Sequence, residues 1–341
     1  MQEPEELSFK DLREITNGFS EKVGEGGFGT VYKGVAKTGK HVAVKILRDV
    51  ISDLNYEQFR NEFRNLTKVQ HDNIVQFLGY CCEREQTRIE CNGRIVLAEN
   101  MHRALCFEFM HNRSLQKHLS DESSGLDWNT RYKIIKGTCE GLRYIHGESL
   151  LHLDMKPDNI LLDENMVPKI ADFGLSRIFG DQLTRATQCS FGTLRYKPPE
   201  YIDKQEISNK FDIFSLGVVI IKIVSGPESY PECLRMPSDK FIDQVSKNWR
   251  ERWQTTCSSD FSLEACCRQV ETCAQIALDC LENNSKKRPN IVKMIEELNK
   301  IECDINKVID IIANFYIENM FHTVNYKFCG NPFDMEIHFI G

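Results

Sequence analysis

The chain has 341 residues, a length that suits one large domain or two small ones. Hydrophobic residues make up 41% of it and charged residues 27%, a balance typical of a soluble globular protein that buries a core without covalent staples. The formal net charge of −7 argues against a dedicated nucleic-acid-binding protein, although a local basic groove stays compatible with it.

No apolar stretch reaches the length that a bilayer span needs. The most apolar run, from Ile213 to Val224, is short and contains Lys222, so we interpret it as a buried helix. The N-terminus is acidic, has no signal-peptide core, and carries Gln2 where N-myristoylation needs glycine. We therefore expect a cytoplasmic protein without a transmembrane segment, with peripheral attachment to the membrane through a partner as a further option.

We expect the 14 cysteines of the chain to be reduced thiols. Two pairs are adjacent in the sequence, Cys81-Cys82 and Cys266-Cys267, and adjacency does not give the spacing of zinc ligands. Without a secretion signal, we expect these residues to pack as small apolar side chains.

The chain begins with a lead-in, residues 1–19, that includes a short amphipathic segment from Phe9 to Phe19. Residues 20–110 follow, with strand patterns and one helix. Three apolar residues alternate along one predicted strand: Val42, Val44 and Ile46. The helical pattern runs from Tyr56 to Val69 and places three apolar residues on one face: Phe59, Phe63 and Leu66.

A polar stretch between about 81 and 103 surrounds Asn92-Gly93. Asn-Gly is a strong signal for a two-residue hairpin turn, and Ile89, Ile95 and Val96 flank it. We expect an extended hairpin inserted between two strands, whose role the sequence does not indicate.

The remainder of the chain is mostly helical in pattern from about residue 112 to 302. Two examples are the stretches from Trp128 to Ile145 and from Met294 to Ile301, which carry apolar residues at helical spacing. Residues 303–341 are rich in aromatic residues and hold no motif beyond a possible helix from Ile305 to Phe315. They are either an added packing element or, in the interpretation we prefer, a tail of no catalytic consequence.

A glycine-rich segment matches the pattern G-x-G-x-x-G-x-V, in which bare backbone can approach phosphates. The similar dinucleotide-binding pattern opens a helix, whereas the residues from Thr30 to Gly34 have a strand pattern, which favours a phosphate-binding hairpin. The residues assigned to nucleotide binding here are Val23, Gly24, Glu25, Gly26, Gly27, Phe28, Gly29 and Val31.

The segment Val42-Ala43-Val44-Lys45 ends an apolar strand with a lysine, which is unfavourable unless a charge meets it. Glu62, on the helix that follows, is the natural partner. A strand-end lysine in water is the alternative, and this segment alone does not decide between them.

The segment from His152 to Asn159 matches H-x-D-x-K-x-x-N. Asp154 would accept or orient a hydroxyl proton, Lys156 would neutralise a transferring phosphoryl group, and Asn159 would hold a metal. A surface loop is the alternative, but apolar runs lie on both sides of the segment.

Two shorter patterns follow. In Asp172-Phe173-Gly174, the aspartate would chelate a Mg²⁺ ion that bridges phosphates. Pro198-Pro199-Glu200 lies near the end of the segment that follows. Each pattern occurs by chance on its own, but five of them in one order and at compatible spacings point to a common site.

Together these motifs resemble the protein kinase superfamily over about residues 20–302. Other segments are similar to the plant receptor-like kinase group, in a cytoplasmic form without ectodomain or membrane span. These segments are Leu7 to Leu12, Thr16 to Ser20, Leu78 to Cys81 and Ile202 to Gly226.

The resemblance implies an α+β, two-lobed fold with ATP between the lobes. The β-rich N-lobe, with one main helix, would cover about 20–110, the mainly helical C-lobe about 111–302, and a tail of unknown role 303–341. Val31 and Ala43 would cover the adenine on one side and Leu161 on the other. Phe107 would be the gatekeeper, and the backbone of Glu108 and Met110 would bind the adenine.

The resemblance also implies that the segment from His152 to Asn159 is the catalytic loop, and that Asp212 anchors it and Thr193 packs against it. Glu200 would pair with Arg288. Lys156 is typical of serine/threonine kinases. Candidate phosphorylation sites are Thr184, Thr187 and Ser190.

Two positions depart from the family pattern. Leu153 replaces the arginine that many kinases carry before the catalytic aspartate, where it meets a phosphorylated residue. We therefore expect activity that is largely independent of that phosphorylation, or low activity unless another element orders the loop. Pro198 stands where alanine is usual and should only stiffen the chain.

The main prediction is a serine/threonine protein kinase that uses ATP and Mg²⁺ to phosphorylate protein substrates in receptor-like kinase signalling. A membrane receptor complex is a candidate partner, and no nucleic acid is expected. The alternative is a pseudokinase-type nucleotide-binding scaffold, which Leu153 and the unusual tail keep open. The full set of catalytic motif residues favours the enzyme. The segment from Ser176 to Tyr201, which resembles the activation segment of receptor-like kinases, fits a small-molecule kinase poorly.

Overall fold

The computed structural model describes residues 3–26, 29–47, 53–91, 94–120, 125–178, 192–253, 260–305 and 307. The chain divides into two compact units, Met1–Leu298 and Asn299–Gly341. Almost all described residues belong to the first unit, which contains every motif discussed above.

The first third of the chain forms a six-stranded sheet in the order β1-β5-β6-β4-β3-β2. β1 is parallel to β5, and the other neighbours are antiparallel. The predicted alternation is confirmed in β4, where Val42 and Val44 are buried. The strands are β1 (Glu5–Glu6), β2 (Lys22–Gly26), β3 (Gly29–Val35), β4 (His41–Leu47), β5 (Phe77–Cys91) and β6 (Arg94–Glu108).

The helix predicted from Tyr56 to Val69 is α2 (Asp53–Leu66), the long helix of this part of the chain. Phe59 and Leu66 are buried on its inner face. The Phe63 ring lies 4.6 Å from the Tyr80 ring, centroid to centroid, so α2 packs against β5. This packing fixes the position of Glu62, which is only 2% exposed.

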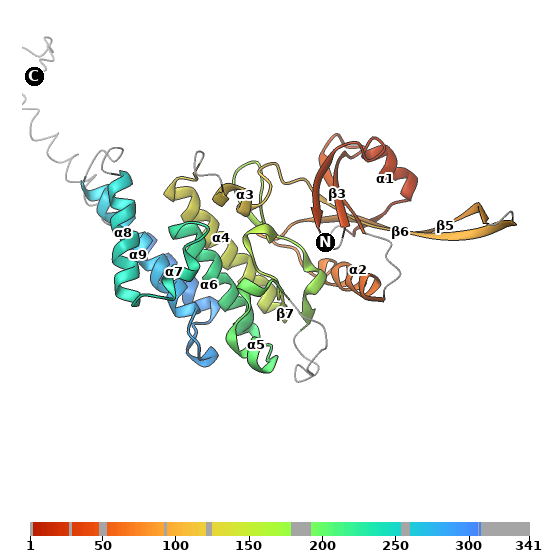
Figure 1. Ribbon diagram of the computed structural model, residues 1–341. Coiled ribbons are helices and arrows are strands. Elements are labelled where there is room, and N and C mark those ends of the chain that lie inside the picture. The colour runs from red at the N-terminus through yellow and green to blue at the C-terminus, as the bar shows by residue number, and fades with distance from the viewer. Residues whose placement is uncertain are drawn as a thin grey trace, which may run out of the picture. The chain divides into compact units, whose positions relative to one another are not determined.

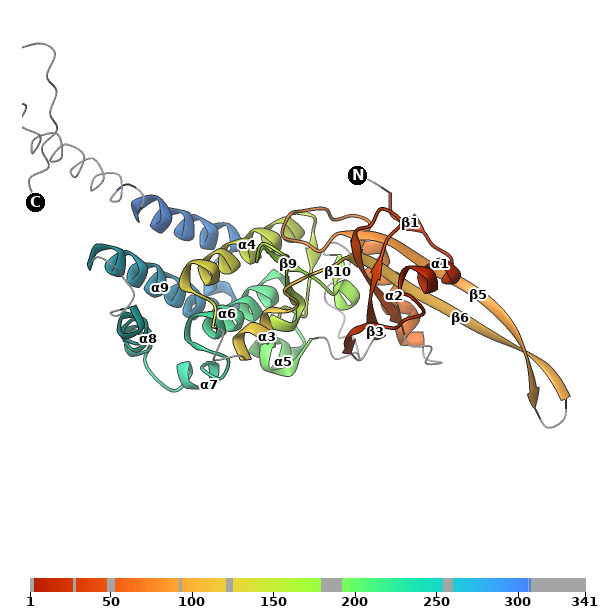
Figure 2. The same ribbon diagram turned by 90° about the horizontal axis from the view of Figure 1, so that it is seen from above.

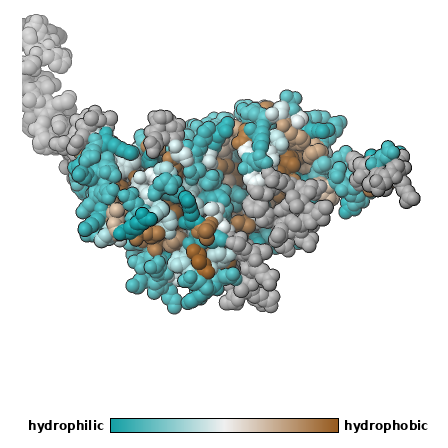
Figure 3. All heavy atoms as spheres, viewed as in Figure 1, coloured by the Kyte–Doolittle hydropathy of each residue, from teal (hydrophilic) through white to brown (hydrophobic). Residues whose placement is uncertain are grey.

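β5 and β6 together form the predicted hairpin, although not as a separate insertion. The two strands themselves are lengthened, with continuous pairing out to Cys91 and Arg94, and the turn residues 92–93 lie outside the described part. Figures 1 and 2 show the outer part extending away from the sheet, and in Figure 3 its described atoms are mainly hydrophilic. We call residues 83–103 the β5–β6 ribbon.

The lead-in packs directly on the sheet. α1 (Phe9–Ile15) begins at Ser8, whose hydroxyl accepts from the Asp11 N–H while Asp11 accepts from the Ser8 N–H. Leu12 is fully buried in a cluster with core residues of β4 to β6. Gly34 permits this approach, because a Cβ there would lie 2.6 Å from the Ile15 side chain.

The rest of the first unit is mainly helical, as Figure 2 shows. The apolar run interpreted as a buried helix is α6 (Asn209–Ser225), whose residues from Phe211 to Val224 are all buried between α4 and α9. Residues 291–298 are also helical. The other helices are α3 (Leu115–Ser120), α4 (Trp128–Gly147), α5 (Pro199–Lys204), α7 (Tyr230–Cys233), α8 (Ser238–Trp253) and α9 (Asp260–Cys280).

Short strands and turns near the sheet carry the motifs of the second half. They form two small two-stranded sheets, β7 with β10 and β8 with β9. The α+β, two-lobed prediction is therefore confirmed, with a β-rich N-lobe and a helical C-lobe. The short strands are β7 (Leu150–Leu151), β8 (Ile160–Leu162), β9 (Pro168–Ile170) and β10 (Arg177–Ile178).

In the second unit, residues 299–305 are helical, and Lys307 pairs with Asp304 at 3.7 Å. The helix predicted from Ile305 to Phe315 lies almost wholly outside the described residues, and the domain limits drawn from the sequence stay a prediction. Among the helices that the structure describes, none combines the length and hydropathy that crossing a bilayer requires. Ten cysteines within the described residues are free thiols, in line with the sequence analysis.

Candidate active site

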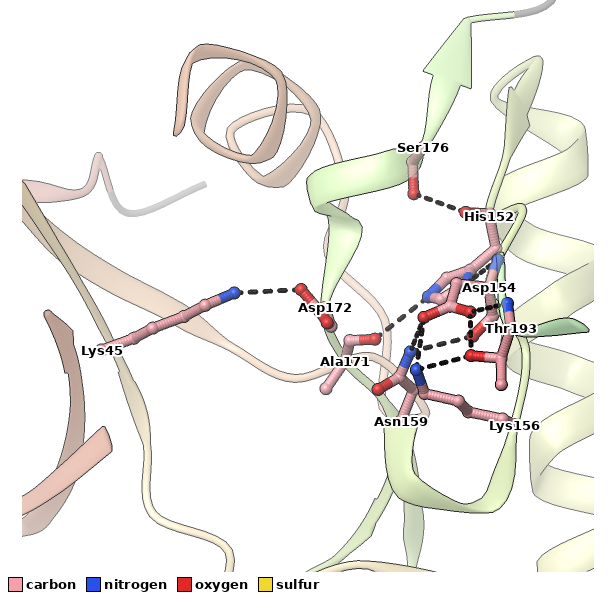
Figure 4. A network of polar contacts seen from close by, with 9 residues as sticks. All are labelled: Lys45, His152, Asp154, Lys156, Asn159, Ala171, Asp172, Ser176 and Thr193. Atoms are coloured by element: carbon pink, nitrogen blue, oxygen red, sulfur yellow. Dashed lines mark hydrogen bonds and ion pairs between the residues drawn. The ribbon is translucent and has the colours of Figure 1, made fainter. Parts of the chain in front are cut away.

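Lys45, at the centre of the sheet on β4, lies between two carboxylates. Its Nζ is 2.8 Å from Glu62 Oε2 and 3.0 Å from Asp172 Oδ1. Figure 4 shows Lys45 extending from the sheet toward Asp172, which comes from the opposite lobe. The predicted Lys45–Glu62 pair is therefore formed, and the alternative of a strand-end lysine in water does not hold.

The three charges of this triad determine each other's protonation. Burial alone would lower the pKa of Lys45, but the carboxylates of Asp172 and Glu62 outweigh it and raise the pKa above its usual value. For Asp172, burial opposes ionisation, but Lys45 prevails and the pKa falls below 3.8. Burial raises the pKa of Glu62 above 4.5 despite the nearby Lys45 ammonium, because the Glu62 side chain is the least exposed of the three.

Asp154 is the centre of the second cluster in Figure 4. Its Oδ1 accepts from the Thr193 N–H (2.9 Å) and hydroxyl (3.0 Å). Its Oδ2 accepts from Lys156 Nζ (2.7 Å) and Asn159 Nδ2 (3.0 Å). With 5% exposure, the carboxylate is fixed in orientation by four donors rather than left to rotate in water.

Thr193 joins the catalytic loop to the chain that follows residues 179–191, which lie outside the described part. It contacts Asp154 as above, and its hydroxyl also accepts from Lys156 Nζ at 3.0 Å. Gly192, with φ +72°, makes this approach possible, since a Cβ there would lie 2.6 Å from the Leu153 carbonyl oxygen. The expected packing of Thr193 is present, whereas Gly192 was not singled out from the sequence.

The backbone of the catalytic loop is held from α6. Asp212, which is fully buried, accepts from the N–H groups of His152 (2.9 Å) and Leu153 (2.8 Å). A ring nitrogen of His146 lies 3.0 Å from the same carboxylate. The anchoring contact inferred for Asp212 is present, and His146 adds a third partner that no motif predicted.

His152 links the two clusters, a role that its position in the motif alone did not indicate. Its Nε2 lies 3.0 Å from the Ala171 carbonyl oxygen, directly before Asp172. Its Nδ1 accepts from the Asp154 N–H at 3.3 Å. Both aspartates are thus positioned by one buried imidazole.

Leu153 lies in a backbone conformation that branched and large residues rarely adopt, with φ +64°. Its side chain is fully buried in an apolar cluster with Leu151, Tyr201 and Phe211. The leucine therefore fills a packed site, which accounts physically for an apolar residue where the family pattern has arginine.

The hairpin predicted to bind phosphate corresponds to β2 and β3, which pair from Lys22–Tyr32 to Gly26–Gly29. Gly29 is required by packing, because a Cβ would clash with the Ile46 carbonyl oxygen on β4. Val23, Gly24 and Val31 are half-buried, and Glu25 and Gly26 are exposed. The two remaining predicted residues, Gly27 and Phe28, lie outside the described part of the chain.

The predicted adenine-contacting residues lie where β4 and β6 end. Ala43 pairs with Phe107, and Met110 follows two residues after β6. The Met110 N–H has no hydrogen-bond acceptor among the described residues, so it is available to a ligand. The Glu108 N–H already donates to the Gln76 carbonyl oxygen (3.1 Å), which leaves only its carbonyl oxygen for an adenine. Leu161, on β8, is half-buried on the C-lobe side.

The donor atoms for a metal also fit. Asp172 is ionised, and only its Oδ1 is engaged by Lys45, while Asn159 uses its Nδ2 to bind Asp154 and leaves Oδ1 without a partner in the described residues. One carboxylate and one amide oxygen suit Mg²⁺, which takes few protein ligands and completes its octahedron with phosphate and water.

Contacts further along the C-lobe follow the resemblance. Arg288 binds Glu200 in a two-pronged ion pair, with distances of 2.6 and 2.7 Å. The candidate phosphorylation sites Thr184, Thr187 and Ser190 lie outside the described residues. A separate cavity of about 920 Å³ behind α2, lined by residues such as Phe63 and Gln70, includes none of the predicted site residues.

Comparison with known proteins agrees with this geometry. The family model for the protein kinase domain matches residues 18–298. Cysteine-rich receptor-like protein kinase 11 of Arabidopsis thaliana is 39% identical over 299 residues, covering 84% of this chain and 42% of the relative. The Arabidopsis receptor-like serine/threonine-protein kinase SD1-7 is 36% identical, with coverages of 83% and 33%.

For cysteine-rich receptor-like protein kinase 44 of the same plant, the identity is 36% and the coverages are 86% and 76%. The chain spans less than half the length of the first two of these relatives. The kinase domain model matches most of this chain. From the family match, the identities and the assembled motifs, it follows that this chain belongs to the protein kinase family, next to the receptor-like serine/threonine kinases.

Proposed function

We propose that the chain is an active serine/threonine kinase that transfers the γ-phosphoryl group of ATP to hydroxyls of protein substrates. The observation that carries this proposal is the four-donor arrangement around Asp154 within one site with the Lys45–Glu62–Asp172 triad. No observation favours the scaffold alternative.

Each side chain has a defined task in this proposal. Lys45, held by Glu62, would bind the α- and β-phosphates, and the open hairpin of β2 and β3 would cover them with bare backbone. Asp172 and Asn159 would hold Mg²⁺, whose charge offsets the charge that develops on the phosphoryl oxygens.

At the other cluster, Asp154 would orient the substrate hydroxyl and accept its proton. Lys156 lies 2.7 Å from this carboxylate and is the cation placed to meet the transferring phosphoryl group. Because little covalent chemistry falls to the protein, positioning and electrostatics provide the rate enhancement, which explains why rigid donors surround Asp154.

A transfer assay with radiolabelled ATP tests the proposal. We expect label on serine and threonine of the chain or of a general protein substrate, and its loss in both Asp154→Asn and Lys45→Met. Nucleotide binding is measured in parallel. A wild-type chain that binds ATP but transfers no label would contradict catalysis.

We further propose that activity does not depend on a phosphorylated residue paired before Asp154, because Leu153 offers no cation and is packed in an apolar cluster. The Thr184→Ala, Thr187→Ala and Ser190→Ala variants, singly and together, should retain transfer of label to an external substrate. Loss of transfer in the triple variant, with folding intact, would contradict this.

Protein partners and location follow from the relatives only as proposals. The relatives are named as receptor-like kinases, so a membrane receptor complex is a candidate partner, and a cytoplasmic position beside the membrane is the candidate location. Fractionation of cells that express the tagged chain, with and without a high-salt wash, would distinguish peripheral attachment from a freely diffusing protein.

A further inference from the structure

Lys222 is a charged residue inside the most apolar helix of the chain. The residue is 7% exposed, and all its neighbours along α6 from Phe211 to Val224 are buried. Its Nζ donates to the Pro227 carbonyl oxygen (2.6 Å), and no carboxylate in the described residues lies within ion-pair distance of it. Burying an ammonium group without a counter-ion raises the free energy of the folded state, so a lysine at this position is unexpected unless it has a function.

The ammonium lies beneath the chain that leads out of the transfer site. It is 5.8 Å from the centroid of the Tyr196 ring. Tyr196 ends a single 3₁₀ turn, Leu194–Tyr196, which begins directly after Thr193, the residue bonded to Asp154. Ser215 on α6 donates to the Tyr196 carbonyl oxygen at 2.7 Å and fixes this turn to the helix.

Three charged groups face Lys222 from the surrounding elements: Glu228 beyond α6, Arg195 on the turn and Asp158 in the catalytic loop. Burial lowers the pKa of Lys222, Glu228 and Asp158 oppose this, and Arg195 adds to it. Arg195 and Glu228 are 75% and 81% exposed and lie 4.0 Å apart, a contact that contributes little to stability. Glu228 is therefore a strong counter-ion for neither Arg195 nor Lys222.

We propose that Lys222 and Arg195 select protein substrates that carry a carboxylate side chain within about three residues of the accepted hydroxyl. The inference deepens the proposed function and rests on it, since a bound substrate is what brings the carboxylate there. A 3₁₀ turn rises about 2 Å per residue, so Arg195 lies about 4 Å and Tyr196 about 6 Å along the turn from Thr193, a span of one to two residues of extended peptide. Lys222 lies against the Tyr196 ring at the end of this span.

A purely structural explanation is the rival. Lys222 lies in the last turn of α6, where a cation is favourable to the helix end, and the Pro227 carbonyl is its acceptor. That role predicts an effect on stability alone. Substrate selection predicts a change in which peptides are phosphorylated, and this difference makes the two separable.

The test uses the full chain and a set of peptides with one serine, in which one position at a time, up to three residues before or after it, is Asp, Asn or Lys. For the wild type we expect kcat/KM to be about 10–100-fold higher for Asp than for Lys at one of these positions, mainly through KM. Lys222→Met should lower the Asp-to-Asn ratio several-fold, because only Arg195 then remains, and Lys222→Glu should reverse the Asp-to-Lys preference.

Lys210→Met is the matched control. Lys210 also lies on α6 and is partly buried, but its ammonium binds the carbonyl oxygens of Arg288 and Pro289. The Asp-to-Lys ratio should keep its wild-type value in this variant. If Lys222→Met does not fold, Arg195→Ala, a change of an exposed side chain, should still lower the ratio several-fold.

The outcomes separate the two proposals. Transfer to peptides without an acidic preference, or a preference that survives both Lys222→Met and Arg195→Ala, would overturn this inference and leave the proposed kinase activity standing. Absence of transfer to every peptide would contradict the proposed function itself, and this inference with it.

Discussion

The catalytic loop and the β5–β6 ribbon are both polar segments, but their polar groups have different kinds of partner. In the loop, Asp154 is 5% exposed and binds Thr193, and the backbone is held by Asp212. In the ribbon, the Gln86–Glu99 and Arg84–Glu99 contacts join the two neighbouring strands and are exposed to water.

This difference predicts where the chain tolerates change. Buried polar groups with distant partners are costly to lose, because removing one leaves the other without a partner away from water. Exposed pairs between adjacent strands contribute little, because water replaces them. The outer ribbon should therefore be tolerant, and the loop should not be.

The largest effect should come from Asp154→Asn. The amide has only one accepting oxygen, so it cannot accept from Thr193 on one side and from Lys156 and Asn159 on the other as the carboxylate does, and it is a poor proton acceptor. We expect kcat to fall by about 10²–10⁴-fold in a steady-state peptide assay. Glu99→Gln makes the same chemical change on the ribbon and should leave kcat within about twofold of wild type. Equal effects of the two changes would remove the distinction between the regions.

Restoring the usual arginine should be strongly destabilising here. Leu153→Arg places a guanidinium in the cluster of Leu151, Tyr201 and Phe211 without a counter-ion. We expect the free energy of unfolding to drop by about 3 kcal/mol or more in urea titrations. Leu153→Met keeps volume and polarity and should cost less than about 1.5 kcal/mol. An arginine variant as stable as wild type would show that the cluster does not require leucine.

The contacts that the sequence predicted are those between neighbouring or patterned segments, and the contacts that it did not predict join distant segments. The Lys45–Glu62 pair and the ribbon pairing follow from local patterns, a lysine ending an apolar strand and an Asn-Gly turn, which need no knowledge of distant segments. The motifs also indicated which aspartates would come together, since their spacing is specific.

Other contacts depend on segments that meet only after folding. Nothing periodic in the sequence places Leu153 in an apolar cluster or His152 between two aspartates. The lead-in was predicted as a separate segment by its position, but the stacking of Phe9 on His102, at 3.7 Å between ring centroids, joins it to the base of the ribbon. Such contacts are tertiary and override local expectation.

Thiol labelling locates the boundary between core and ribbon. Cys81 is fully buried and burial raises its pKa to about 12, whereas its neighbour Cys82 is exposed. Because the thiolate is the reactive form, alkylation of the native chain at pH 8 should modify Cys82 at least about 100-fold faster than Cys81. Peptide mass spectrometry measures both rates, and urea should abolish the difference. Equal native rates would mean that the ribbon opens at its base.

The smallest effect should come from shortening the ribbon. Residues 86–99 can be replaced by Asn-Gly, so that Glu85 and Asn100, which already pair, flank a two-residue turn. We expect the free energy of unfolding to change by less than about 1 kcal/mol and kcat to stay within about twofold. Phe9→Ala, at the ribbon base, should cost more, about 1–2 kcal/mol. A shortened ribbon that abolishes transfer would reveal a functional role for its outer part.

Calorimetric titration of ATP, with and without Mg²⁺, gives the most direct test of the central claim that a charged triad and two metal-binding side chains surround a nucleotide. In the wild type, Mg²⁺ should tighten ATP binding by about tenfold or more, and Asp172→Asn should remove most of that gain. If Asp172→Asn bound ATP with the same Mg²⁺ dependence as the wild type, Asp172 would not hold the metal, and the proposed site would be wrong.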